Sequence, residues 1–388
     1  MTVAGWTAPG FERVRDVLAG ANLDDGGGAF AAYVAGERVV DLWTGQADAD
    51  EPWQEQTVSG TYSSTKALVT GCLVVLHHDG LVELDKPVAD NWPEFAVAGK
   101  ERVTVRQLLA HSAGLVEVPG YQGFLGVHGE NWDQREEIRA RLAAAQPAWE
   151  PGEAHAYHGL TFGYLAGALV ERVSGLPLTE FFRTRLAEPW GLDLHFGLTA
   201  ETDGRRARQL PQAPLPPEQE AVAEAVRAVA RDPDTLLGKA FWAQDGTTVL
   251  EHLAASGNDP VRMGCGAGNG DVVGSARALA QFFVHLARGP LADSTRAFAE
   301  VHRRGSDLAL GVPATWCVGF QGNDVSAVGG LAMGPGERTF GHGGAGGQLA
   351  GYDPERELAF GFVRNQLSPV SPAAHDLLYA TCEALLTR

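Results

Sequence analysis

Apolar runs typical of β-strands lie at both ends of this chain, and a mainly helical pattern occupies its middle. Ala29 to Ala35 and Arg38 to Thr44 are apolar-rich runs joined around Gly36-Glu37, which is the pattern of an antiparallel hairpin. Four more strand-like runs occur near 316–320, 339–342, 347–352 and 358–363. This distribution predicts a sheet closed by the two termini, with a helical domain inserted between its halves.

The middle of the chain has the period and the end signals of helices. From Ser63 to Gly80 an apolar stripe recurs at helical spacing, and Val105 to Leu109 and Tyr164 to Val173 follow the same rule. Four prolines between Leu210 and Pro217 precede an acidic, alanine-rich helix from Glu218 to Ala230. We therefore expect an α/β domain with a central antiparallel sheet from residues 1–60 and 265–388, and a mainly helical domain from 61–264. An insertion at 200–262 would serve as a lid or a surface arm.

The composition excludes several classes of partner. A net charge of −18 and a pI near 5.0 oppose binding to nucleic acid or to an anionic membrane, since both need a basic surface. The four cysteines are far apart and form no Cys-x-x-Cys motif, so neither a disulfide framework nor a thiolate metal site is expected. No signal-like or 18-residue apolar segment is present, which predicts a cytoplasmic protein. A homo-oligomer is compatible with all of these observations.

Ser63 and Lys66 stand three residues apart in the stretch Tyr62-Ser63-Ser64-Thr65-Lys66. Only four of the 30 basic residues are lysine, which suggests that a lysine beside a serine has a task that arginine cannot perform. Lysine can lose its proton, whereas arginine in practice cannot. At i and i+3 on a helix the two side chains share one face, and a buried amine can take the proton of a serine hydroxyl. The pair predicts a serine nucleophile with a lysine base; the structural alternative is a helix start with an exposed lysine.

Two further segments fit this chemistry. Tyr157 lies in a loop just before a helix, where a phenol can relay a proton, although a lone tyrosine is more typical of a packed aromatic residue. The segment from Gly341 to Gly347 is rich in glycine and is flanked by strand-like sequence. Small residues along an edge strand let a substrate carbonyl approach the backbone and accept N–H hydrogen bonds as an oxyanion.

Taken in order, these segments resemble the serine β-lactamase and penicillin-binding-protein superfamily, and within it the family VIII carboxylesterases, which are similar to class C β-lactamases. The resemblance runs from about residue 10 to the C-terminus. It rests on the segments Tyr62–Lys66, Asp79–Pro87, Thr104–Leu115, Pro151–Gly175 and Gly341–Asn365. It implies an α+β fold of the β-lactamase/penicillin-binding-protein type, with an antiparallel sheet flanked by helices, an inserted helical domain, and a site between the two.

The chain departs from this superfamily at two motifs. Of the set Ser-x-x-Lys, Ser-Asp-Asn and Lys-Thr-Gly, only the first is kept. Where class C enzymes have Tyr-x-Asn, the chain reads Tyr157-His158-Gly159, which lacks the side chain that would hold a substrate amide. His342-Gly343-Gly344 occupies the Lys-Thr-Gly position, so the cation that pairs with a β-lactam carboxylate is absent. Both departures favour uncharged ester substrates.

Residues and resemblance together predict a serine hydrolase that cleaves small carboxylic esters through an acyl-enzyme on Ser63. Lys66 would accept the serine proton, and Tyr157 would share the proton network and help activate the deacylating water. The backbone N–H groups of Ser63 and, by resemblance, of Ala345 would form the oxyanion hole. The candidate substrate-binding residues are Gly159, His342, Gly343 and Gly344, with His342 lining the pocket or donating a hydrogen bond.

Other functions use the same residues. The enzymatic alternatives are amide or β-lactam hydrolysis, D-amino-acid peptidase activity and acyl transfer. The alternative from another class is a catalytically inactive binding protein on this fold, which would be expected to have lost Ser63, Lys66 or Tyr157.

Three competing motifs lack the context that they need. Ser112, in Ala110-His111-Ser112-Ala113-Gly114, approximates a nucleophile elbow but follows a helix instead of a strand, which favours a structural role. The glycines at 341, 343 and 346 match a dinucleotide fingerprint, but a strand follows them instead of a helix, so no cofactor is expected. His77-His78 and His155-x-x-His158 lack carboxylate or cysteine companions at ligand spacing, so no metal site is expected.

Overall fold

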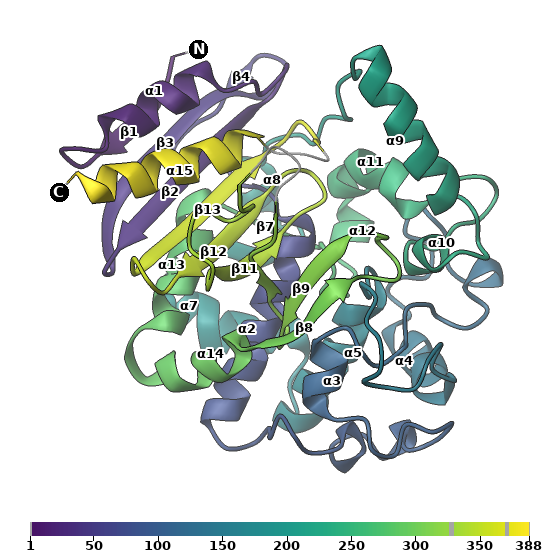
Figure 1. Cartoon of the computed structure of the whole chain (residues 1–388). Coiled ribbons are helices and arrows are strands. Elements are labelled where there is room, and N and C mark those ends of the chain that lie inside the picture. The colour runs from purple at the N-terminus through teal and green to yellow at the C-terminus, as the bar shows by residue number, and fades with distance from the viewer. Residues whose placement is uncertain (1, 326–329, 369–371, 388) are drawn as a thin grey trace.

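Both ends of the chain contribute to one large antiparallel sheet. The computed structural model describes residues 2–325, 330–368 and 372–387. Its sheet has ten strands in the order β1-β3-β2-β13-β12-β11-β10-β9-β8, with β4 paired to β3 (Figure 1). The strands are β1 Ala4–Thr7, β2 Gly27–Val34, β3 Glu37–Asp48, β4 Glu51–Pro52, β8 Val301–Ser306, β9 Pro313–Cys317, β10 Gln321–Gly322, β11 Phe340–Gly343, β12 Leu349–Asp353 and β13 Leu358–Arg364. The sheet closed by the two termini is thus confirmed.

The predicted hairpin joins the two halves of this sheet. Ala35 and Gly36 have φ of 51° and 87°, and two successive positive φ values give the turn whose twist matches that of paired strands. Strand β2 pairs with β3 on one side and with β13 on the other, where Phe30 lies opposite Phe362. This pairing brings residues more than 300 positions apart into one hydrophobic core.

Helices cover both faces of the sheet. On one face α1 Glu12–Gly20 and α15 Pro372–Leu386 lie side by side (Figure 1) and bury Phe11, Val14 and Leu377 against the β2–β3 hairpin. On the other face α13 Ala276–Ala287 packs against β2, β12 and β13. Gly361 permits this approach, because a Cβ there would lie 2.3 Å from the carbonyl oxygen of Ala276.

The central helix α2 Thr65–His78 is buried along most of its length, which agrees with its apolar sequence. It packs against α5, α6 and α14. The remaining helices are α3 Val105–Leu109, α4 Arg135–Ala144, α5 Thr161–Ser174, α6 Leu178–Phe182, α7 Glu188–Trp190, α8 Ala200–Asp203, α9 Pro217–Ala230, α10 Leu236–Ala240, α11 Leu253–Asn258, α12 Pro260–Met263 and α14 Ala292–Ala299. None of the helices in the described ranges has the length and apolar character needed to cross a bilayer.

A small second sheet sits beside the first turn of α2. Its strands β5 Ser59–Gly60, β7 Val272–Gly274 and β6 Leu194–Phe196 lie in the order β5-β7-β6. Because β5 ends two residues before Tyr62, its pairing with β7 fixes the direction in which the chain enters α2.

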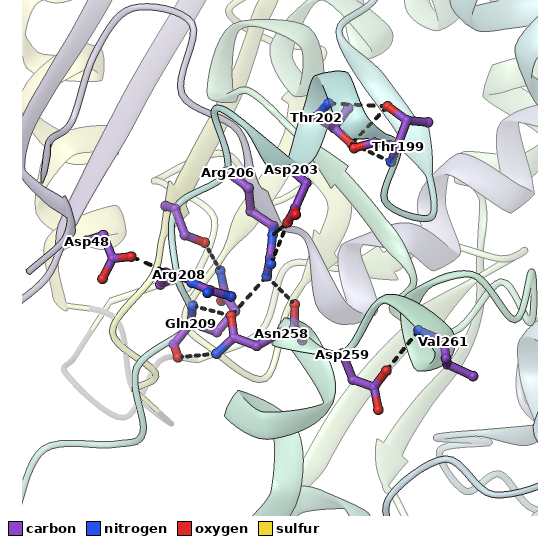
Figure 2. A network of polar contacts seen from close by, with 12 residues as sticks. Asp48, Thr199, Thr202, Asp203, Arg206, Arg208, Gln209, Asn258, Asp259 and Val261 are labelled. Atoms are coloured by element: carbon purple, nitrogen blue, oxygen red, sulfur yellow. Dashed lines mark hydrogen bonds and ion pairs between the residues drawn. The ribbon is translucent and has the colours of Figure 1, made fainter.

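Residues 210–257, here called the excursion, begin and end beside one polar network. Figure 2 shows Asn258 between Arg206 and Gln209. The Asn258 Oδ1 accepts from Arg206 Nη1 at 3.0 Å and from the Gln209 N–H at 2.9 Å, and its Nδ2 donates to the Gln209 carbonyl at 2.8 Å. Asp203 pairs with Arg206 at 2.7 Å. The two ends of the excursion are therefore held together at its base.

Candidate active site

A 3-10 turn, Tyr62–Ser64, presents Ser63 just before α2 begins. The sequence predicted a helix from Ser63, but the tighter turn comes first and α2 starts at Thr65. Tyr62 has φ of 45°, a left-handed conformation that costs about 1–3 kcal/mol outside glycine and needs support from its surroundings. The support is a buried phenol whose OH donates to Gln209 Oε1 at 3.0 Å and to the Leu253 carbonyl at 3.3 Å.

The next residue ties the turn to the large sheet. Ser64 Oγ donates to the carbonyl of His342 in β11 at 2.9 Å. Gly344 lies so close that a Cβ there would be 2.7 Å from the Thr61 carbonyl oxygen. The glycine-rich segment after β11 is therefore needed for the strand to approach the Ser63 turn.

Lys66 is fully buried and lies against Ser63. Its Nζ is 3.2 Å from Ser63 Oγ and 3.4 Å from the Asn269 carbonyl oxygen. Burial lowers the pKa of Lys66 from its ordinary value of 10.5 to about 7; Asp271 raises it in part, and Arg262 lowers it further. An amine that loses its proton near neutral pH can accept a proton from the hydroxyl beside it.

Tyr157 completes this cluster from a distant part of the chain. The Lys66 Nζ lies 5.1 Å from the centre of the Tyr157 ring. Burial raises the pKa of Tyr157 above its ordinary value of 10.0, a hydrogen bond with the Ser63 side chain lowers it, and Asp307 raises it. The phenol therefore stays protonated at neutral pH and can donate to and accept from neighbouring groups.

Asp307 and Trp316 fix the position of Tyr157. The Trp316 ring stacks on Tyr157 with centroids 5.2 Å apart and an interplanar angle of 1°. The buried Asp307 carboxylate accepts from the Tyr157 backbone N–H at 3.1 Å through Oδ1 and from Trp316 Nε1 at 3.0 Å through Oδ2. One carboxylate thus binds both the backbone of Tyr157 and the ring of Trp316.

A small cavity of about 30 Å³ opens at Ser63. Its lining residues are Tyr62, Ser63, Gly159, Leu160, Phe241, Val249, Leu250, Leu253, Arg262, Asn269, Gly270 and Ala345. Within the described residues, no backbone carbonyl or side chain accepts a hydrogen bond from the N–H of Ser63 or of Ala345. Two free N–H donors at one cavity beside a hydroxyl are the arrangement that holds an oxyanion.

The segment 200–262 supplies much of this lining. Phe241, Val249 and Leu253 come from the excursion, and Arg262 follows it in α12. The sequence offered a lid or a surface arm for this segment, and in the structure part of it forms a wall of the cavity. Gly159 leaves room for the Phe241 ring, because a Cβ at position 159 would lie 2.9 Å from two atoms of this ring. An asparagine at position 159 would require this ring to move.

His342 holds the position of the missing lysine and carries no charge at neutral pH. Burial, together with the positive charge of Lys66, lowers its pKa to about 3. Its Nδ1 lies 2.7 Å from the Gly343 carbonyl, and a carbonyl only accepts, so the proton sits on Nδ1. The buried Nε2 therefore carries a lone pair and can only accept, and it has no partner among the described residues. His342, Gly343 and Gly344 are not among the residues that line the cavity.

The competing candidates lie elsewhere or have structural partners. Ser112 is fully buried and donates to the Gln107 carbonyl at 2.9 Å. His158 accepts from the Leu115 N–H at 3.0 Å, and burial lowers its pKa to about 4. In the part of the chain that the structure describes, no group of three His, Cys, Asp or Glu side chains could hold a metal ion.

The side chains of this site that sequence reasoning missed include Phe241, Asn269, Asp307 and Trp316. Each lies more than 80 positions from Tyr157 or Ser63 along the chain. The one available signal was the glycine-rich run Gly264 to Gly270 that surrounds Asn269, since glycines often mark a close backbone approach.

Known proteins share this fold over nearly the whole chain. The beta-lactamase family model matches residues 20–384. The esterase/beta-lactamase LipL of Mycobacterium tuberculosis is 32% identical over 364 residues, which are 90% of this chain and 80% of LipL. The crystal structure of a family VIII carboxylesterase has a TM-score of 0.84 at 31% identity, with 99% of this chain and 100% of that chain covered. EstA from Arthrobacter nitroguajacolicus Rue61a has a TM-score of 0.81 at 28% identity, with 100% and 99% covered. The chain therefore belongs to the beta-lactamase family and has the fold of its esterase members.

Proposed function

We propose that this hydrolase, an enzyme of the carboxylesterase type, cleaves small carboxylic esters through an acyl-enzyme on Ser63. The observation that carries the proposal is the buried amine of Lys66, with a pKa of about 7, 3.2 Å from Ser63 Oγ. A serine hydroxyl becomes an effective nucleophile when a neighbouring base takes its proton in the transition state.

The reaction proceeds in two halves. Lys66 takes the Ser63 proton as Oγ attacks the ester carbonyl carbon, and the N–H groups of Ser63 and Ala345 stabilise the resulting oxyanion. As the tetrahedral intermediate collapses, the carbon–oxygen bond to the alcohol breaks, and the proton returns to the alkoxide through Lys66 and Tyr157. Water then attacks the acyl-enzyme, gives its proton to the same pair, and releases the carboxylic acid and free Ser63.

The site favours uncharged esters over anionic β-lactams. His342 is neutral, and the ring of Phe241 fills the space that an amide side chain at position 159 would need. One charge-assisted contact is worth about 1.5–3 kcal/mol, so its loss lowers β-lactam turnover by roughly 10- to 150-fold. The structurally similar family VIII carboxylesterase supports the ester assignment by its name, whereas the name of LipL gives both esterase and beta-lactamase.

Two measurements test the proposal. Intact-protein and peptide mass spectrometry after treatment with a p-nitrophenyl phosphonate should show one adduct, located on Ser63. The kcat/KM for p-nitrophenyl butyrate should exceed that for nitrocefin under the same conditions. A nitrocefin value equal to or above the ester value would replace the esterase with a β-lactam hydrolase on the same residues. An adduct on another residue would exclude Ser63 as the nucleophile.

A further inference from the structure

Asn269 places a buried amide beside the proposed nucleophile and base. It is 4% exposed and lines the same cavity as Ser63 and Ala345. Its backbone carbonyl oxygen is 3.4 Å from Lys66 Nζ, and its backbone N–H donates to Asp271 Oδ1 at 3.2 Å. Contacts at both its backbone C=O and its backbone N–H therefore hold Asn269 in place.

The orientation of the Asn269 amide follows from one hydrogen bond. Its Oδ1 accepts from the backbone N–H of Gly163, in the first turn of α5, at 2.7 Å. A backbone N–H can only donate, so the atom facing Gly163 must be the oxygen and the other atom must be the NH₂ group. Gly163 allows this contact because a Cβ there would lie 2.4 Å from Asn269 Oδ1.

The NH₂ group of Asn269 has no hydrogen-bond partner among the residues that the structure describes. Leaving a buried donor unpaired costs about 1–3 kcal/mol, and such a group calls for a functional explanation. The Asn269 side chain takes no part in the two-step reaction proposed above. An acceptor supplied by a bound substrate would satisfy this donor.

We propose that Asn269 Nδ2 donates a hydrogen bond to an acceptor oxygen in the acyl part of the substrate. The inference rests on the proposed esterase function, because the acyl group is the part that stays on Ser63 while the alcohol leaves. It names the substrate class as esters whose acyl chain carries an ether, keto or amide oxygen close to the ester carbonyl. Asn269 would thereby supply the amide that Gly159 lacks, from a segment about 110 positions further along the chain.

A pair of equally long substrates tests this hydrogen bond. p-Nitrophenyl methoxyacetate and p-nitrophenyl butyrate differ in one position of the acyl chain, where an oxygen replaces a methylene. The ratio of their kcat/KM values is compared between wild type, Asn269→Asp and Asn269→Leu. Dividing by the wild-type ratio removes the intrinsic reactivity of the two esters, and an effect on Lys66 would change both esters alike.

We expect the ratio to fall by roughly 3- to 10-fold in both variants, the value of one neutral hydrogen bond. Asn269→Asp keeps an oxygen for the Gly163 N–H, so it tests the donor even if Asn269→Leu does not fold. Asn131→Asp is the matched control, because Asn131 is exposed and is not among the residues that line the cavity; its ratio should stay within about twofold of wild type.

The outcomes separate the two proposals. If wild type cleaves neither ester, the esterase function is wrong. If it cleaves both and Asn269→Asp leaves the ratio unchanged, the role of Asn269 is wrong. The acyl assignment is also overturned if the variants instead change the ratio between 2-methoxyethyl butyrate and butyl butyrate, since those esters carry the extra oxygen in the alcohol.

Discussion

The pH dependence of ester hydrolysis should report the protonation of Lys66. Because kcat/KM follows the free enzyme, it should fall on the acid side with a midpoint near pH 7, where burial places the pKa of Lys66. Only the neutral amine accepts a proton, so each pH unit below the midpoint lowers the rate about tenfold, and about 1% of the activity is left at pH 5. His342 adds no step in this range, since burial lowers its pKa to about 3.

Two substitutions should move this midpoint in opposite directions. The negative charge of Asp271 stabilises the ammonium form and raises the pKa of Lys66, so Asp271→Asn should shift the acid limb to lower pH. The positive charge of Arg262 disfavours the ammonium form and lowers that pKa, so Arg262→Gln should shift the limb to higher pH. Asp293→Asn is the control, because the Asp293 side chain is 89% exposed and pairs with Arg296.

The assay is hydrolysis of p-nitrophenyl butyrate from pH 5 to pH 9 at constant ionic strength, with thermal unfolding of each variant measured at the same pH values. A flat wild-type profile between pH 5 and pH 8 would refute Lys66 as the base. Shifts of the two variants in the same direction would refute the electrostatic reasoning. A shift in Asp293→Asn equal to that of Asp271→Asn would show that the acid limb follows overall charge.

Three further predictions concern single residues. Ser63→Ala should lower kcat by at least about 10³-fold while the protein stays folded, whereas Ser112→Ala should stay active, since its hydroxyl is bonded to Gln107; the opposite pattern in a p-nitrophenyl butyrate assay would exchange their roles. Lys66→Arg keeps the charge but not the dissociable amine and should be nearly as inactive as Lys66→Ala, and substantial activity would mean that Lys66 acts only as a cation. Asp307→Asn turns an NH₂ group toward an N–H donor and should lower the free energy of unfolding by about 1–3 kcal/mol in urea titration; an unchanged stability would contradict the role of Asp307 in holding Tyr157 and Trp316.

The parts of the fold and of the site that depend on short-range interactions could be predicted from the sequence. The hairpin follows from apolar runs around a turn residue, and Ser63 and Lys66 meet because the first residues after the 3-10 turn continue into a helix. Such features depend on neighbours within a few positions, so spacing alone locates them. The same holds for α3, whose bounds Val105–Leu109 match the prediction.

The rest of the site depends on contacts between distant segments. Asn269, Asp307 and Trp316 lie near Lys66 or Tyr157 through the packing of segments that are distant in sequence, and only the glycines around Asn269 give a local signal of a close approach. The missing asparagine at position 159 was read as a lost amide, whereas the structure places the ring of Phe241 there and brings the amide of Asn269 to the same cavity. A motif that is absent from one segment therefore does not show that its chemical group is absent from the site.

The excursion gives this enzyme a way to change its substrates without changing its chemistry. Its two ends meet at Asn258, Arg206 and Gln209, while Lys66 and Tyr157 lie on other segments. Insertions, deletions or whole-segment exchange between related enzymes can therefore alter Phe241, Val249 and Leu253 and leave the proton-transfer groups in place. Gln209 and the backbone of Leu253 limit such exchanges, because the Gln209 side chain and the Leu253 carbonyl accept from the Tyr62 phenol that supports the nucleophile turn. Directed evolution for new acyl groups should accordingly accumulate changes inside 210–257 and spare position 209.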